Sequence, residues 1–231
     1  MTNEELFLGR KEQSKLIEKF LSSNINNAAL VYGRRRVGKT ELIKHCLKKT
    51  ETPSIYYECK ETSELNNIES ISEIIAETFG LPPLAFDSFE SALAFLYKRA
   101  TEKNLTVVID EYPYIRKVVK GLDSIIQSLI DNNRSKSKLK IIICGSYVET
   151  MKSLLSEENP LYGRFDLVMN LKAMDYYDSA LFYKNFKDED KIRLYSVFGG
   201  IPYYNRFIDS SKSVKQNIID LIASPDGRFA N

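Results

Sequence analysis

Residues 33–40, Gly-Arg-Arg-Arg-Val-Gly-Lys-Thr, have the types and spacing of a phosphate-binding loop. Gly33 and Gly38 leave room for backbone N–H groups to wrap a polyphosphate at the positive end of a following helix. Lys39 would reach the β and γ phosphates, and Thr40 would offer its hydroxyl to Mg²⁺. The loop therefore predicts a site for a nucleoside triphosphate. The other expected nucleotide contacts in and just after this loop are Arg34, Arg35, Arg36, Val37 and Glu41.

A pair of carboxylates ends the apolar segment 105–111, Leu-Thr-Val-Val-Ile-Asp-Glu. A run that is apolar on both faces predicts a strand buried at the centre of a parallel sheet, and ligands of such sheets bind beyond the carboxyl ends of the strands. We therefore predict that Asp110 holds Mg²⁺, directly or through water, and that Glu111 orients and polarises the attacking water. For this dipeptide alone, two solvated acids would be the simpler interpretation.

Two further candidates each rest on a single side chain. Ser146 follows the predicted strand 139–145, so its hydroxyl would lie at the same sheet edge and could sense the γ-phosphate or help to place water. Arg164 lies in a loop before the predicted strand 166–171 and is the best candidate for an arginine finger. A surface or structural arginine is the alternative for Arg164.

The N-terminal motif Phe-Leu-Gly-Arg precedes an amphipathic helix predicted over residues 11–23. The motif either belongs to a helix packed on the domain or supplies an apolar shelf for a nucleotide base. We include it among the expected nucleotide contacts, which here are Phe7, Leu8, Gly9 and Arg10. Near the C-terminus, Gly-Gly-Ile-Pro at residues 199–202 predicts a sharp turn whose glycines could let a helical lobe close on the nucleotide, and Pro202 joins the expected contacts.

These motifs are spaced along strands that alternate with helices, as in an α/β domain. The predicted strands cover residues 28–32, 53–59, 105–111, 139–145 and 166–171. Tyr112-Pro113-Tyr114 is predicted to break the secondary structure before the next helix. From Met174 onward the pattern is helical, and its aromatic side chains are predicted to be core residues. We therefore divide the chain into an α/β core over residues 1–172 and a helical lid over residues 173–231.

The chain of 231 residues is 43% hydrophobic and 28% charged, with a formal net charge of +2, as in an ordinary globular protein. This balance gives no global argument for nucleic acid or membrane. The basic loop at residues 134–140 is interpreted first as a solvated turn, with a DNA contact as the alternative. The three cysteines share no metal-ligand spacing and indicate a reducing compartment. There is no signal-peptide pattern and no apolar run of the roughly 20 residues needed to span a bilayer, so we expect a cytoplasmic protein.

Taken together and in order, six motifs of this chain resemble the archaeal-type AAA ATPases of prokaryotes, a family related to the STAND NTPases and the origin-recognition ATPases. These motifs are Phe-Leu-Gly-Arg (7–10), the phosphate-binding loop (33–40), Val-Ile-Asp-Glu (108–111), Cys-Gly-Ser (144–146), Pro-Leu-Tyr-Gly-Arg (160–164) and Gly-Gly-Ile-Pro (199–202). The resemblance implies a three-layer P-loop fold, with a five-stranded parallel sheet in the order 5-1-4-3-2 and a small C-terminal helical lid. It also implies ATP and Mg²⁺ as ligands.

The same resemblance assigns roles by position. Lys39 and Thr40 match the first nucleotide motif of the family, Asp110 and Glu111 the second, and Ser146 its polar sensor. Arg164 matches the arginine of the Pro-Leu-Tyr-Gly-Arg motif. Family members usually continue into a winged helix and an effector region, which are not expected in this sequence.

The expected function is that of an ATP-binding and ATP-hydrolysing domain that acts as a switch or motor for a partner. A small-molecule kinase would share the phosphate-binding loop, but a glutamate directly after Asp110 counts against it. A third option is a nucleotide-gated scaffold that binds DNA or protein with little hydrolysis. ATP and ADP are the expected ligands, and a second copy of the chain, DNA or an effector protein stays open as a partner.

Overall fold

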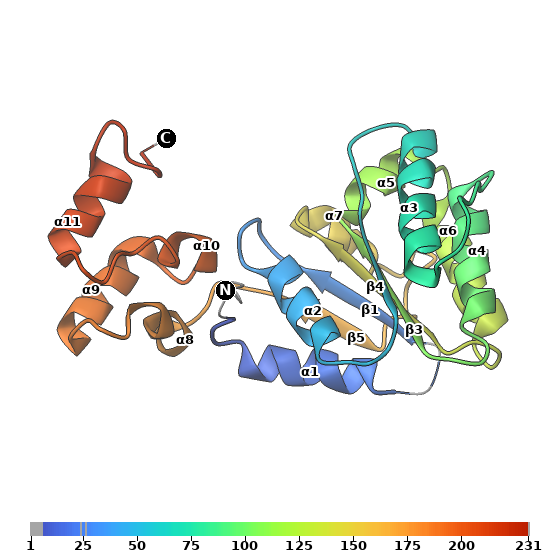
Figure 1. The fold of residues 1–231 in the computed structure, drawn as a ribbon, viewed down its shortest axis with the longest axis horizontal. Helices are drawn as coiled ribbons and strands as arrows, with labels where there is room; N and C mark the ends of the chain where they lie inside the picture. Colours follow the sequence, from blue (N-terminus) through green and yellow to red (C-terminus); the bar gives the residue numbers. More distant parts are fainter. Residues whose placement is uncertain (1–6, 24, 26, 231) are drawn as a thin grey trace.

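The computed structural model describes residues 7–23, 25 and 27–230. Figure 1 shows a twisted sheet between two layers of helices, with the helices that follow the last strand gathered beside it. The sheet has five parallel strands in the order β2-β3-β4-β1-β5. The strands are β1 (Asn27–Tyr32), β2 (Ser54–Glu58), β3 (Leu105–Asp110), β4 (Leu139–Gly145) and β5 (Leu167–Asn170). The predicted α/β fold and strand order are confirmed.

Two helical layers cover the sheet. The helices of the α/β part are α1 (Lys11–Leu21), α2 (Lys39–Lys48), α3 (Glu64–Phe79), α4 (Phe89–Arg99), α5 (Tyr112–Val118), α6 (Leu122–Asn133) and α7 (Val148–Ser153). Helices α1 and α2 pack on one face through a core that includes Ile17, Leu42 and Val108. Helices α3 to α7 cover the other face, where the larger core forms.

The three central strands, β1, β3 and β4, are buried along their whole length. Because helices cover both faces, these strands carry apolar side chains at successive positions instead of alternating with polar ones. The three cysteines, Cys46, Cys59 and Cys144, are buried free thiols, as expected for small apolar side chains in this core.

The predicted break at Tyr112-Pro113-Tyr114 is wrong, because helix α5 begins at Tyr112 and holds Pro113 in its first turn. Proline is tolerated there, since the first N–H groups of a helix have no intrahelical acceptor and the ring presets a helical φ. The residue before the helix, Glu111, has a left-handed backbone with φ of 48°. This conformation turns the chain sharply from the end of β3 into α5.

The helices after β5 form a small core of their own around Tyr183, Leu194 and Phe198. They are α8 (Tyr176–Ala180) with a 3₁₀ turn (Leu181–Tyr183), α9 (Asp188–Phe198), α10 (Pro202–Asn205) and α11 (Val214–Ile218) with a π turn (Ile219–Ala223). Tyr177 is 80% exposed, so the prediction that it is a core residue is wrong. The division at residues 172 and 173 stays a prediction. Within the described ranges, no helix is long and apolar enough to cross a membrane.

Candidate functional site

The loop between β1 and α2 has the backbone that its glycines predict. A Cβ atom on Gly33 would lie 2.1 Å from the backbone oxygen of Leu171, so no larger residue fits there. Gly38 precedes α2 in a left-handed conformation with φ of 92°. The N-terminus of α2 therefore opens into the loop, where its backbone N–H groups and helix dipole favour an anion.

A cleft of about 730 Å³ lies over this loop, between the carboxyl edge of the sheet and the C-terminal helices. It brings together segments that are far apart in sequence. The predicted site residues that line it are Phe7, Leu8, Arg10, Arg35, Arg36, Val37, Gly38, Lys39, Thr40, Glu41, Glu111, Ser146 and Pro202. The predicted site residues that are not among its lining residues are Gly9, Gly33, Arg34, Asp110 and Arg164.

A chain of hydrogen bonds joins the lysine of the loop to the second carboxylate. The ammonium of Lys39 donates to the backbone oxygens of Gly33 (2.9 Å) and Arg34 (3.2 Å) and to Oγ of Ser146 (2.8 Å). The Ser146 hydroxyl donates to Oε1 of Glu111 at 2.7 Å, and its backbone N–H donates to Oε2 at 3.2 Å. Ser146 therefore holds the Glu111 carboxylate at both oxygens and connects it to Lys39, the lysine predicted to bind phosphate.

The predicted metal-binding side chains lie in direct contact. The hydroxyl of Thr40 donates to Oδ2 of Asp110 at 2.9 Å, and the backbone N–H of Glu111 donates to Oδ1 at 2.8 Å. A hydroxyl and a carboxylate are hard oxygen donors, and Mg²⁺ commonly takes one or two such groups while substrate phosphates and water complete its octahedron. Among the described residues there is no cluster of three or more His, Cys, Asp or Glu that could hold a metal alone. Thr40 and Asp110 therefore fit Mg²⁺ that binds together with a nucleotide.

Apolar side chains from two distant segments line the cleft. Phe7 and Leu8 come from the N-terminal segment, and Met174, Phe182 and Pro202 come from the segment after β5. The ring of Phe7 stacks on His45 of α2, with centroids 4.0 Å apart and an interplanar angle of 13°. The N-terminal motif thus lines the cleft and α1 packs on the sheet, while contact of the motif with a nucleotide base stays a prediction.

Arg10 connects three segments around the cleft. Its guanidinium donates to the backbone oxygens of Val37 (3.1 Å) and Lys172 (2.6 Å), and its backbone N–H donates to Asp178 of α8 at 2.9 Å. Burial lowers the pKa of Arg10 from its ordinary value. A Cβ on Gly9 would lie 2.7 Å from the Asp178 carboxyl carbon, which explains the glycine before it. Gly9 and Arg10 therefore hold the C-terminal helices against the phosphate-binding loop.

Sequence patterns missed most of the contribution of the C-terminal helices. Tyr203 of α10 lines the cleft, and its ring lies 4.5 Å from the guanidinium of Arg36 and 5.0 Å from that of Arg206. The lining residues that no motif indicated are Glu58, Tyr114, Met174, Phe182, Tyr203, Asn205, Arg206 and Ile208. Only Pro202 was expected, from the turn before it. The other positions carry no local signal, since their role depends on how the helices pack.

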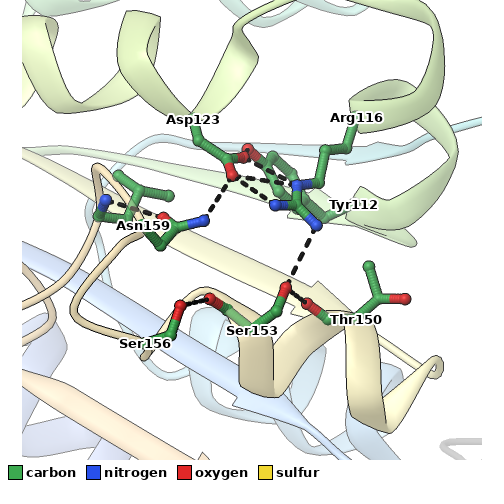
Figure 2. A network of polar contacts seen from close by, with 8 residues as sticks. Tyr112, Arg116, Asp123, Thr150, Ser153, Ser156 and Asn159 are labelled. Carbon is green, nitrogen blue, oxygen red and sulfur yellow. Dashed lines mark hydrogen bonds and ion pairs between the residues drawn. The ribbon is translucent and has the colours of Figure 1, made fainter.

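Arg164 lies in the loop before β5, where it contacts Asp131 of α6, and it does not line the cleft of its own chain. Its Nη2 donates to Oδ2 of Asp131 at 2.9 Å, and its Nη1 donates to the backbone oxygen of Tyr162. Figure 2 shows the network that anchors this loop, in which Asn159 donates to Asp123 at 2.8 Å. Asp123 also accepts hydrogen bonds from Tyr112 and Arg116 of α5. The geometry offers Arg164 no contact with a nucleotide in its own cleft, so action in trans stays a prediction.

The arrangement of sheet, loop and acids defines the class of protein. A glycine-bounded loop follows β1, the carboxylate pair follows β3, and Ser146 follows β4, which lies between these two strands. All three groups meet at one sheet edge, as in the P-loop nucleotide-binding folds.

The particular family follows from comparison with known proteins. The sequence profile of the family described as "ATPase domain predominantly from Archaea" matches residues 7–205, and the chain belongs to this family. An uncharacterised protein of Methanocaldococcus jannaschii, MJECL04, is 31% identical over 201 residues, which are 86% of this chain and 43% of that protein. An uncharacterised ATP-binding protein of the same organism, MJ0423, is 45% identical over 53 residues, which are 22% of this chain and 90% of that protein. The chain thus spans less than half of the length of MJECL04.

Solved structures share the fold at low sequence identity. The Walker-type ATPase PABY2304 of Pyrococcus abyssi matches with a TM-score of 0.66 and 21% identity, over 92% of this chain and 71% of that chain. The ORC2 protein of Aeropyrum pernix, solved as ADPNP and ADP complexes, matches with a TM-score of 0.64 and 14% identity, over 95% of this chain and 63% of that chain. The ORC1 protein of the same organism, solved in complex with DNA, matches with a TM-score of 0.62 and 14% identity, over 87% of this chain and 58% of that chain.

Proposed function

We propose that this domain binds Mg·ATP in the cleft, hydrolyses it and acts as a nucleotide-dependent switch for a partner. One observation carries the proposal: the hydrogen-bonded chain from Lys39 through Ser146 to Glu111, beside the contact of Thr40 with Asp110. A phosphate-binding cation, a candidate water-activating carboxylate and oxygen ligands for Mg²⁺ thus lie around one point. A solvated pair of acids would not need this buried lysine.

The phosphates would bind at the loop and the N-terminus of α2. Lys39 is only 5% exposed, and two of its three acceptors are neutral backbone oxygens. A γ-phosphate oxygen is a stronger acceptor for the ammonium, because it carries negative charge and a carbonyl oxygen does not. Thr40 and Asp110 would hold Mg²⁺, which would supply positive charge to offset that of the phosphates. Glu111 would accept a proton from the attacking water, with Ser146 holding the carboxylate in place.

The base would lie against the apolar side chains that line the cleft. Phe7 and Leu8 would contact one face of it, and Pro202 and Met174 would close the other side. The ADPNP and ADP complexes of the ORC2 protein, which has the same fold, support nucleotide as the ligand. The base would then lie between the N-terminal segment and the C-terminal helices, so that nucleotide binding and the position of these helices would be linked.

One observation favours the scaffold as a second candidate. Both oxygens of Glu111 accept hydrogen bonds from Ser146, which occupy part of the hydrogen-bonding capacity of the carboxylate. Hydrolysis would be slow until a partner or a second protomer shifts Ser146 or completes the site. In that case the domain would bind ATP, and DNA or an effector protein would read the bound state.

Calorimetry with Mg·ATP tests the proposal. Lys39→Ala should weaken binding at least tenfold, since a hydrogen bond to a charged group is worth about 1.5–3 kcal/mol. Lys48→Ala is the matched control, because this lysine lies in the last turn of the same helix and is exposed. Equal affinities of wild type and Lys39→Ala would remove the basis of the proposal.

A further inference from the structure

A tyrosine that belongs to no nucleotide-binding motif contacts the candidate metal site. Tyr56 lies on β2, the edge strand beside β3, where it pairs with Val108 two residues before Asp110. Its hydroxyl donates to Oδ2 of Asp110, the same oxygen that accepts the hydrogen bond from Thr40. Tyr56 therefore contacts the carboxylate that Mg²⁺ would use.

The rest of the Tyr56 side chain contacts the helix that follows the phosphate-binding loop. The ammonium of Lys44 lies 4.7 Å from the centre of the ring and comes from α2, the helix that begins at Lys39. The ring is thus packed against the phosphate-binding helix while its hydroxyl reaches the sheet edge.

We propose that Tyr56 is a positioning residue for Mg²⁺, an inference that rests on the proposed function. Asp110 is held at Oδ1 by the backbone N–H of Glu111 and at Oδ2 by Thr40 and Tyr56. Three donors on two oxygens prevent the carboxylate from rotating, so Oδ2 faces Thr40 before any metal arrives. Hydrogen-bond partners of metal-binding carboxylates orient them, and their loss typically weakens metal binding by about 10–100-fold.

The neighbouring residue on the same strand supplies a matched control. Tyr57 points to the opposite face of the sheet, where its hydroxyl donates to Oδ1 of Asn67. That oxygen also accepts from the backbone N–H of Lys60 at 3.0 Å, so Tyr57→Phe leaves it with a partner. Tyr56→Phe and Tyr57→Phe remove the same hydroxyl from adjacent positions, and only Tyr56→Phe touches Asp110.

The test measures Mn²⁺ affinity by electron paramagnetic resonance, on the full chain saturated with a non-hydrolysable ATP analogue. Calorimetry of the same analogue in a chelating buffer measures nucleotide affinity without metal. Tyr56→Phe should bind Mn²⁺ about tenfold more weakly than wild type, with metal-free nucleotide affinity and melting temperature close to those of Tyr57→Phe. The metal-free measurement confirms that the variant is folded and competent to bind.

The other outcomes of these measurements would reject either the role of Tyr56 alone or the proposed function as well. Equal Mn²⁺ affinity of Tyr56→Phe and wild type would overturn the role of Tyr56 while leaving the proposed function intact. An equal loss in Tyr57→Phe would also overturn it, because the effect would then belong to the strand and not to the contact with Asp110. A wild-type chain that binds no nucleotide in either experiment would reject the proposed function and this inference together.

Discussion

Replacing Glu111 with glutamine separates nucleotide binding from hydrolysis. The amide matches the carboxylate in size and can keep both contacts with Ser146: its oxygen accepts from the backbone N–H, and its NH₂ group donates to the hydroxyl, which has two lone pairs. Two charge-assisted hydrogen bonds become neutral ones, which lowers the free energy of unfolding by about 1 kcal/mol. For a domain of this size the melting temperature should then fall by about 2–4 °C.

Turnover should fall much further than stability. If Glu111 accepts the proton of the attacking water, its loss should slow ATP hydrolysis by roughly 10²–10⁴-fold, the usual contribution of a positioned general base. Mg·ATP affinity should stay within a few-fold of wild type, because Lys39, Thr40 and Asp110 are unchanged. Phosphate release under single-turnover conditions, with calorimetry alongside, measures both quantities.

Glu149→Gln is the matched control for this substitution. Glu149 forms an exposed ion pair with Lys152 on α7, and such pairs contribute about 0–1 kcal/mol. If the wild type hydrolyses ATP and Glu111→Gln retains that rate, Glu111 is not the base. If the wild type binds ATP but releases no phosphate, even when concentrated or given DNA, the nucleotide-gated scaffold is the better description.

Three further predictions concern the arginine, the lid and the network of Figure 2. If Arg164 acts in trans, the specific ATPase rate should rise with protein concentration in wild type and stay flat in Arg164→Ala; flat rates in both would make the residue structural. Mg·ATP should slow hydrogen exchange across residues 174–222, and identical exchange with and without it would rule out a closing lid. Urea unfolding should show that Asp123→Asn lowers the free energy of unfolding by about 1.5–3 kcal/mol at neutral pH, and that this difference shrinks below about pH 4. A difference between wild type and variant that does not change with pH would contradict this prediction.

The pH dependence of the last prediction follows from the surroundings of Asp123. Burial alone would raise the pKa of this carboxyl, but hydrogen bonds from Arg116, Tyr112 and Asn159 lower it below its ordinary value. A lowered folded-state pKa means that the stabilisation is present above the unfolded-state pKa and is lost as the pH falls through the folded-state pKa. Asparagine cannot titrate, so the wild type approaches the stability of the variant only in acid.

Local and regular patterns determined much of this protein. The glycine spacing of residues 33–40 requires only a strand, a tight turn and a helix, which are contiguous in the chain. Continuous apolar runs identified the buried strands, and the carboxyl ends of parallel strands meet at one edge, so Lys39, Glu111 and Ser146 were correctly expected to lie together. The start of α5 was missed because Pro113 breaks a helix in its interior but not in its first turn.

Only the tertiary structure decided which distant side chains complete the site. Tyr56 reaches Asp110 because β2 pairs with β3 in one register, and Tyr203 reaches Arg36 because α10 packs over the phosphate-binding loop. Arg164, which a motif marks, pairs with Asp131 on the outer side of α6, and no spacing in the chain indicates that partner. The physical reason is that a motif encodes the backbone of one short segment. Contacts between segments depend on how whole helices and strands bury their apolar faces against one another.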